Sequence, residues 1–132
     1  MARGIAGVVA GLVAWLVVAT LANLLVRVAW PAYAEVEKAM TFSVAMMAVR
    51  LVVGAVSSLS AGLAVAWVTR GNGIAAKALV VALIAVFIPV HYALWEKFPF
   101  WYHAIFFASL LLITLVGATL IVRDTKGQRV RP

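Results

Sequence analysis

The chain has 132 residues, of which 67% are hydrophobic and only 11% are charged. Soluble domains carry about 25% charged residues, so this composition indicates a membrane protein with no separate soluble domain. The net charge of +7 does not indicate nucleic-acid binding, because the basic residues lie at the ends of predicted helices rather than in one patch. The absence of cysteine excludes disulfides, iron–sulfur clusters and thiolate zinc sites.

The first predicted helix covers residues 5–28. Its apolar run is too long for a signal-peptide core and long enough to cross a bilayer, so we interpret it as a retained membrane span. Gly7 and Gly11 form a GxxxG pair in its first half, a spacing that allows two helices to approach closely. The second half turns polar at Asn23 and Arg27.

A proline at position 31 stops this helix, and residues 31–42 are predicted to form an exposed loop. The second predicted helix covers residues 43–68 and carries Arg50. Small residues follow Arg50 at steps of four, which predicts a tightly packed face against the first helix or against a second copy of the chain. These small residues are Gly54, Ser58, Gly62 and Ala66.

The second half of the chain repeats this alternation of turns and apolar runs. A glycine-rich turn at residues 69–73 precedes a third predicted helix over residues 74–95. Residues 96–100 form the next turn, and a fourth helix is predicted over residues 101–122. The segment 123–132 is predicted to be a basic tail without regular structure. The fold class is therefore an all-α, four-helix transmembrane bundle with up-down connectivity.

Basic residues are unevenly divided between the two ends of the predicted bundle. The positive-inside rule therefore predicts cytoplasmic termini and a multi-pass protein of a bacterial inner membrane. The end with both termini carries Arg3, Arg70, Lys77, Arg123, Lys126, Arg129 and Arg131, whereas the other end carries Arg27, Lys38, Lys97, Glu35, Glu37 and Glu96.

Candidate ligand-binding residues fall in the predicted outer half of the membrane. Arg50 lies about two turns inside its helix, and a charged residue within a span is a functional hypothesis because its burial is costly without a partner. Two interpretations stay open: Arg50 pairs structurally or extends to the interface, or it binds an anionic group beside aromatic side chains. The candidate set is Asn23, Arg50, His91, Tyr92, Trp95, Glu96, Trp101 and His103.

Aromatic residues gather at the same end and are predicted to form a belt at the membrane interface. The belt comprises Trp30, Tyr33, Trp95, Phe98, Phe100, Trp101 and Tyr102. The alternative is that these side chains wall a pocket for an apolar or quinone-like ligand beneath the belt.

His91 and His103 lie at similar depths on consecutive helices, and two imidazoles can ligate one haem. A tight turn sets the two helix axes only about 8–10 Å apart, which is cramped for a porphyrin. No cofactor is therefore predicted, and haem b is kept as an alternative. Two histidines without an intramembrane carboxylate also make a poor divalent-metal site, so no metal is predicted.

The small-residue second helix lies between two proline-containing motifs, Trp30-Pro31 and Phe98-Pro99-Phe100-Trp101. This layout resembles small four-helix proteins of bacterial inner membranes. The resemblance covers most of the chain and implies no activity.

Three classes of function remain. The first is a non-enzymatic protein that acts by helix–helix association, as a homo-oligomer or an accessory subunit of a membrane complex; the small-residue faces favour it. The second binds or transports a small or lipid-like molecule through a polar pocket formed by Asn23, Arg50 and His91. The third is a haem- or quinone-binding electron-transfer subunit that uses His91 and His103. No catalytic constellation is present, so an enzyme is not predicted. The expected partners are the lipid bilayer and either further copies of the same chain or another membrane protein, not nucleic acid.

Overall fold

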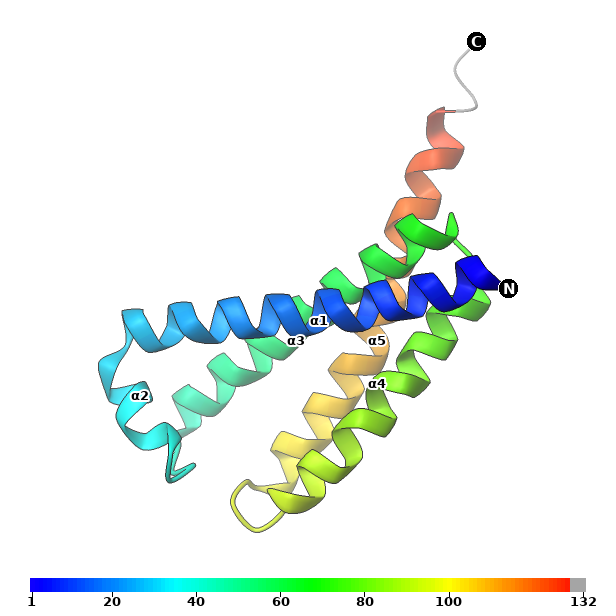
Figure 1. The fold of residues 1–132 in the computed structure, drawn as a ribbon. Coiled ribbons are helices and arrows are strands. Elements are labelled where there is room, and N and C mark those ends of the chain that lie inside the picture. Colours follow the sequence, from blue (N-terminus) through cyan, green and yellow to red (C-terminus); the bar gives the residue numbers. More distant parts are fainter. Residues whose placement is uncertain (129–132) are drawn as a thin grey trace.

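The computed structural model describes the backbone of residues 1–128 and the side chains of residues 1–121. This part of the chain forms five helices (Figure 1), namely α1 (Ala2–Ala29), α2 (Pro31–Glu37), α3 (Val44–Thr69), α4 (Gly73–Ala93) and α5 (Phe100–Gln128). Four segments are long and apolar enough to cross a membrane: Ala2–Ala29, Val44–Thr69, Gly73–Ala93 and Phe100–Ile121. The chain is therefore a multi-pass membrane protein with an all-α bundle, as predicted.

Local signals fix where α3 and α4 begin. The Ser43 hydroxyl accepts a hydrogen bond from the backbone N–H of Met46, and the Asn72 side chain accepts one from the N–H of Ile74. Both caps satisfy backbone donors that lack a partner in the first helical turn. Between these helices, Arg70 and Gly71 adopt positive φ values of 57° and 81°, so the predicted turn is confirmed.

The GxxxG pair of α1 packs inside the bundle. A Cβ atom at Gly7 would meet the side chain of Thr69 in α3, and one at Gly11 would meet Leu79 in α4 and the backbone of Ala61 in α3. The two glycines therefore let α1 lie directly against α3 and α4, which confirms the close approach predicted from their spacing.

The small-residue face of α3 packs mainly against α5. A Cβ atom at Gly62 would lie 2.1 Å from the backbone oxygen of Thr114, and one at Gly54 would lie 3.2 Å from the ring of Phe106. On the same face, Ser58 accepts a hydrogen bond from the indole of Trp15 in α1. The prediction of α1 or a second copy was therefore incomplete, because the main partner is the last helix of the same chain.

The predicted exposed loop over residues 31–42 is wrong in its first half. Pro31 occupies the first turn of α2, where its missing N–H costs no hydrogen bond and its fixed φ suits a helix. Tyr33, which the sequence placed in the exposed loop and the interfacial belt, is only 1% exposed. Proline at position 31 thus ends one helix and starts the next.

The helix α5 also continues further than predicted. It runs to Gln128, so the first six residues of the predicted tail are helical. Lysine and arginine have high helix propensity, so positive charge at the end of an apolar helix does not terminate it. Residues 129–132 of the predicted tail lie outside the described residues.

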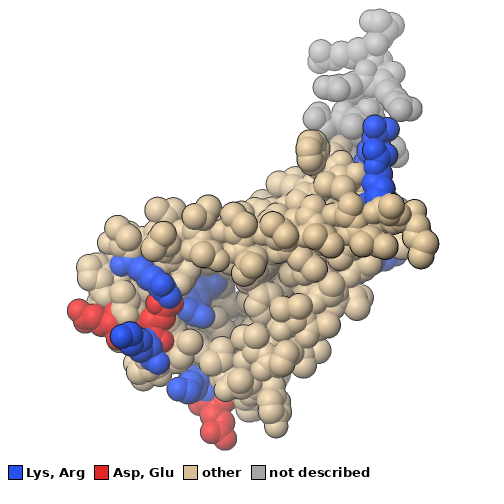
Figure 2. All heavy atoms as spheres, viewed as in Figure 1, with Lys and Arg blue, Asp and Glu red and all other residues tan. Residues whose placement is uncertain are grey.

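The bundle is closed at one end and open at the other. We define the terminal half as the part near the N-terminus and the α3–α4 turn, and the cavity half as the part near α2 and the α4–α5 turn. The helices α1 and α4 meet in the terminal half and diverge toward α2 (Figure 1). Charged side chains gather at the two ends, and a broad uncharged zone separates them (Figure 2). That distribution suits a membrane-spanning molecule.

Candidate functional site: a polar cavity between the helices

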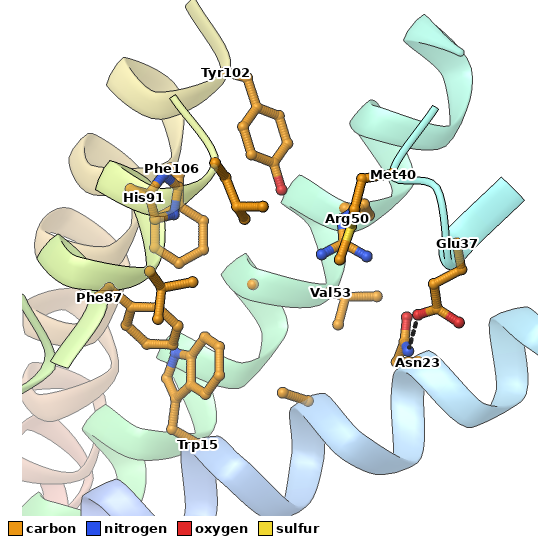
Figure 3. A pocket seen from close by; sticks show the side chains of 14 residues that line it. Trp15, Asn23, Glu37, Met40, Arg50, Val53, Phe87, His91, Tyr102 and Phe106 are labelled. Carbon is orange, nitrogen blue, oxygen red and sulfur yellow. Dashed lines mark hydrogen bonds between the residues drawn. The ribbon is translucent and has the colours of Figure 1, made fainter. Parts of the chain in front are cut away.

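A cavity of about 210 Å³ lies in the cavity half, where the helices diverge. At about 30 Å³ per molecule of liquid water, this volume corresponds to about seven waters. All five helices and the segments that follow α2 and α4 contribute to its wall (Figure 3). The wall comprises Trp15, Ala19, Asn23, Glu37, Met40, Arg50, Val53, Gly54, Phe87, Val90, His91, Leu94, Tyr102 and Phe106.

A chain of hydrogen bonds links three elements along one side of the cavity. Arg50 Nη1 in α3 donates to the Tyr33 hydroxyl of α2 at 2.9 Å, and that hydroxyl donates to Asn23 Oδ1 of α1 at 2.9 Å. The Asn23 Nδ2 atom in turn donates to Glu37 Oε1 at 3.0 Å, as Figure 3 shows. Every link uses a different donor, so the network holds α1, α2 and α3 in one arrangement.

Glu37 is the negative end of this network. Its second carboxylate oxygen forms an ion pair with Arg27, whose side chain is 48% exposed. Burial alone would raise the pKa of Glu37, but hydrogen bonds from Arg27 and Asn23 and the positive charge of Arg27 and Arg50 outweigh it. The net effect lowers the pKa below its ordinary value of 4.5, so Glu37 is ionised at neutral pH.

Among the side chains of residues 1–121, no carboxylate forms an ion pair with Arg50. Its guanidinium lies 4.7 Å from the ring centre of Phe42 and 5.9 Å from that of Phe98. Its Nε atom is buried without a hydrogen-bond partner, and the Tyr102 hydroxyl points into the space beside it (Figure 3). Among the side chains that the structure describes, the one ion pair is Arg27–Glu37. Arg50 is therefore held by neutral partners.

Tyr33 does not supply the missing negative charge. Burial raises the pKa of its hydroxyl, and this effect outweighs the opposite influence of Arg50. The phenol is therefore neutral at physiological pH. With Arg27 and Arg50 as cations and Glu37 as the anion, the network carries a net charge of about +1 beside a cavity.

The two histidines contact each other directly. His91 Nδ1 and His103 Nδ1 are 2.6 Å apart, and the two rings are 5% and 3% exposed. Trp95 stacks on His103 with ring centres 4.9 Å apart, and Phe106 covers His91 with ring centres 4.3 Å apart. A haem ligated by both rings holds its iron between the two ring nitrogens, whereas the Nδ1 atoms here bond directly to each other and leave no room between them. This arrangement therefore does not fit a haem between the two histidines.

The structure brings some of the predicted site residues together and separates others. Asn23, Arg50 and His91 line the same cavity, as their similar predicted depths suggested. His103 lies behind His91, bonded to it and away from the wall. The remaining candidates do not line the cavity and are exposed: Tyr92 is 83% exposed, Trp95 53% and Trp101 38%, and Glu96 is also exposed. One face of Trp95 nevertheless covers His103.

The predicted aromatic belt divides in the same way. Trp95, Phe100 and Trp101 are exposed, whereas Tyr33, Phe98 and Tyr102 are 1%, 4% and 4% exposed. The buried three form a cluster with Phe42, Met46 and Met47 that encloses the Arg50 side of the cavity. A belt residue and a buried aromatic at the same depth look alike in sequence, so the pattern alone did not separate them.

Sequence reasoning missed Tyr33 and Tyr102 as parts of the site. One signal for Tyr33 was present, because a proline that ends one helix is also favoured in the first turn of the next. A helix that starts at Pro31 places Tyr33 beside the end of α1, within reach of Asn23. No comparable signal marked Tyr102, which needs the packing of α5 against α3.

The fold and the cavity together define a multi-pass membrane protein with a partly polar cavity among its helices, lined by the Arg50 cation and the Glu37 carboxylate. No protein-family model, curated protein or solved structure matches the chain.

Proposed function

We propose that this protein binds an anionic amphiphile, with its acidic headgroup in the cavity and its apolar part toward the lipid. The observation that carries the proposal is Arg50, a cation inside the bundle that has neutral partners, an unused Nε donor and a cavity beside it. Burial of an unpaired charge is costly, and an anion in the cavity offsets that cost.

The size and wall of the cavity favour a headgroup rather than a whole ligand. Sites that enclose drug-sized molecules have volumes of about 300–1,000 Å³, and this cavity of about 210 Å³ is smaller. Its wall combines the polar ends of Asn23 and Arg50 with apolar side chains such as Ala19, Val90 and Leu94. The cavity is partly open to the molecular surface, so a chain attached to the headgroup can extend out of it.

The charge bias of the sequence supports an outward-facing cavity. The positive-inside rule puts the termini in the cytoplasm, so α2 and the cavity half face the opposite side of a bacterial inner membrane. The ligand then comes from the outer leaflet or from the solution beyond it. We take this function to be non-enzymatic, because Glu37 in the cavity wall is already paired with Arg27, and His91 bonds to His103 rather than to a nucleophile.

The association hypothesis has less support, because its main argument was the small-residue faces. Gly7, Gly11, Gly54 and Gly62 all meet helices of the same chain. The electron-transfer hypothesis needed the two histidines to accept a ligand between them, and they bond to each other instead.

The test is ligand binding to the purified protein in nanodiscs of neutral lipid. We expect octanesulfonate to raise the thermal midpoint and octyltrimethylammonium to leave it unchanged. Arg50→Gln should weaken octanesulfonate binding about tenfold or more, because a hydrogen bond to a charged group contributes about 1.5–3 kcal/mol. Lys38→Gln, the same charge change at an exposed position near the same end, should bind as the unmodified protein does.

Arg50→Lys is a second variant that distinguishes weaker binding from a folding defect. It keeps the positive charge and should bind octanesulfonate with intermediate affinity. Equal stabilisation by the cationic and anionic amphiphiles would contradict the proposal. Unchanged octanesulfonate affinity in a folded Arg50→Gln protein would also contradict it.

A further inference from the structure

The His91–His103 pair is the buried titratable group that the proposed anion site does not use. His91 belongs to α4 and lines the Arg50 cavity, whereas His103 belongs to α5 and lies outside the cavity wall. The two Nδ1 atoms are 2.6 Å apart, which is a hydrogen bond between the rings. His103 Nε2 is buried and has no hydrogen-bond partner among the described residues. The pair therefore connects the cavity to a nitrogen that the described part of the fold leaves unsatisfied.

The geometry limits how many protons the pair can hold. A hydrogen bond between two Nδ1 atoms requires one ring to carry a proton there and the other to accept it. One added proton fits on an outer Nε2 atom, and the resulting imidazolium strengthens the bond to its neutral neighbour. A second added proton would place hydrogens on both facing Nδ1 atoms and break the bond. The pair is thus built to accept one proton.

The groups that face the pair decide when it accepts that proton. From α3 it meets the Arg50 cation across the cavity, and from α2 the Glu37 carboxylate, which Arg27 already pairs. Tyr102 of α5 stacks on His91, and Tyr33 of α2 is a neutral phenol at physiological pH. The helix α1 contributes Trp15 and Asn23 to the cavity, neither of which titrates.

An empty cavity therefore opposes protonation, because the new charge faces Arg50 with no free anion between them. An acidic headgroup in the cavity reverses this, because it attracts both cations. The bound anion then raises the affinity of the pair for a proton, and the bound proton raises the affinity of the cavity for the anion by the same factor, as thermodynamic linkage requires.

We propose that the cavity takes up its anion together with one proton, which the His91–His103 pair holds. This inference rests on the anion-binding function proposed above and adds a second ligand to it, the proton. The unit bound is then an anion with a neutralising proton, which carries no net charge into the bilayer. Anion binding is accordingly tighter at acidic pH than at alkaline pH.

The experiment measures octanesulfonate binding by calorimetry on the protein in neutral nanodiscs between pH 5 and pH 8. A sulfonate stays ionised over this range, so any pH dependence belongs to the protein. Titrations in buffers with different ionisation enthalpies count the protons taken up, and this count needs no variant. We expect up to one proton per bound sulfonate, and an affinity that rises by up to about tenfold per pH unit of acidification.

His103→Gln removes one ring and leaves the cavity wall intact. We expect it to bind octanesulfonate at pH 8 within about twofold of the unmodified protein and to lose most of the gain at pH 5. Tyr92→Phe, on the exposed face of the same helix as His91, should keep the full pH dependence.

The possible failures are distinguishable. Binding with no proton uptake and no pH dependence overturns this inference and leaves the anion site standing. Proton uptake that persists when both His91 and His103 are changed to Gln assigns the proton to another group and also overturns it. No sulfonate binding at any pH overturns the proposed function itself.

Discussion

The terminal half and the cavity half of the bundle are built from different residues. In the terminal half, glycine and alanine bring helix backbones into contact, and Gly62 faces the backbone of Thr114 with no room for a methyl group. In the cavity half, the core is formed by aromatic and methionine side chains such as Tyr33, Phe42 and Met46. Large side chains hold helices apart, so the same four spans are closed at one end and hollow at the other.

This difference shows how a small membrane protein can combine stability with a polar site. Helices in lipid associate through close packing rather than through the hydrophobic effect, and small residues provide that packing in the terminal half. The cavity half relies in addition on hydrogen bonds from Arg50 through Tyr33 to Asn23, which tie α1, α2 and α3 together beside the cavity. The comparison can be tested by disrupting either the close helix packing of the terminal half or the hydrogen-bond network of the cavity half.

The largest effect is expected from closing the space at the α3–α5 crossing. Gly62→Ala places a methyl group 2.1 Å from a backbone oxygen that belongs to α5. Neither backbone can yield without separating the helices, so we expect a loss of about 3 kcal/mol or more in unfolding free energy. The measurement is the thermal midpoint and the yield of monodisperse protein in a mild detergent.

Gly4→Ala is the matched control, because a Cβ atom there meets nothing within 4 Å. It should be as stable as the unmodified protein or slightly more so, since alanine favours a helix over glycine by about 1 kcal/mol. A Gly62→Ala protein with unchanged stability would show that α3 and α5 do not cross at this point.

A smaller effect is expected from breaking the network of the cavity half. Tyr33→Phe keeps the ring but removes the hydroxyl that accepts from Arg50 and donates to Asn23. A buried polar group left without its partner costs about 1–3 kcal/mol, which should appear as a lower thermal midpoint. Tyr92→Phe removes a hydroxyl from a side chain that is 83% exposed, and it should change stability by less than about 0.5 kcal/mol. Equal effects of the two substitutions would contradict the network.

The sequence predicted the spans and part of the cavity because both depend on position along a helix. Apolar length defines a span, and counting residues from the helix ends placed Asn23, Arg50 and His91 at a similar depth. What the sequence did not predict depends on direction around the helix. A membrane helix such as α1 is apolar on every side, so periodicity does not show which face is inside. The choice of α5 as the partner of Gly62 follows from three-dimensional packing alone.

The histidine pair illustrates the same limit. The sequence placed His91 and His103 at similar depths in the membrane. Depth alone does not distinguish two rings that bond to each other from two rings that face a common ligand. The 2.6 Å contact requires both side chains to point along one line between α4 and α5. Likewise, Tyr33 and Trp95 both matched the belt pattern, and only one of them is exposed.

The smallest effect is expected from acidification, which acts on the cavity half through Glu37. Because the pKa of Glu37 in the folded protein lies below its ordinary value of 4.5, its contribution to stability is complete above that value. The contribution is lost as the pH falls through the lowered pKa, when protonation breaks the ion pair with Arg27. The thermal midpoint should therefore fall between pH 6 and pH 3, whereas Glu37→Gln should start lower at pH 6 and fall less. Glu35→Gln, which changes an exposed residue of α2, should have the same pH profile as the unmodified protein.

Identical pH profiles for Glu37→Gln and the unmodified protein would mean that Glu37 does not stabilise the fold as a carboxylate. The positive charge at the cavity would then have no internal balance from α2, and the cavity half would depend on a bound anion more strongly than the hydrogen-bond network suggests.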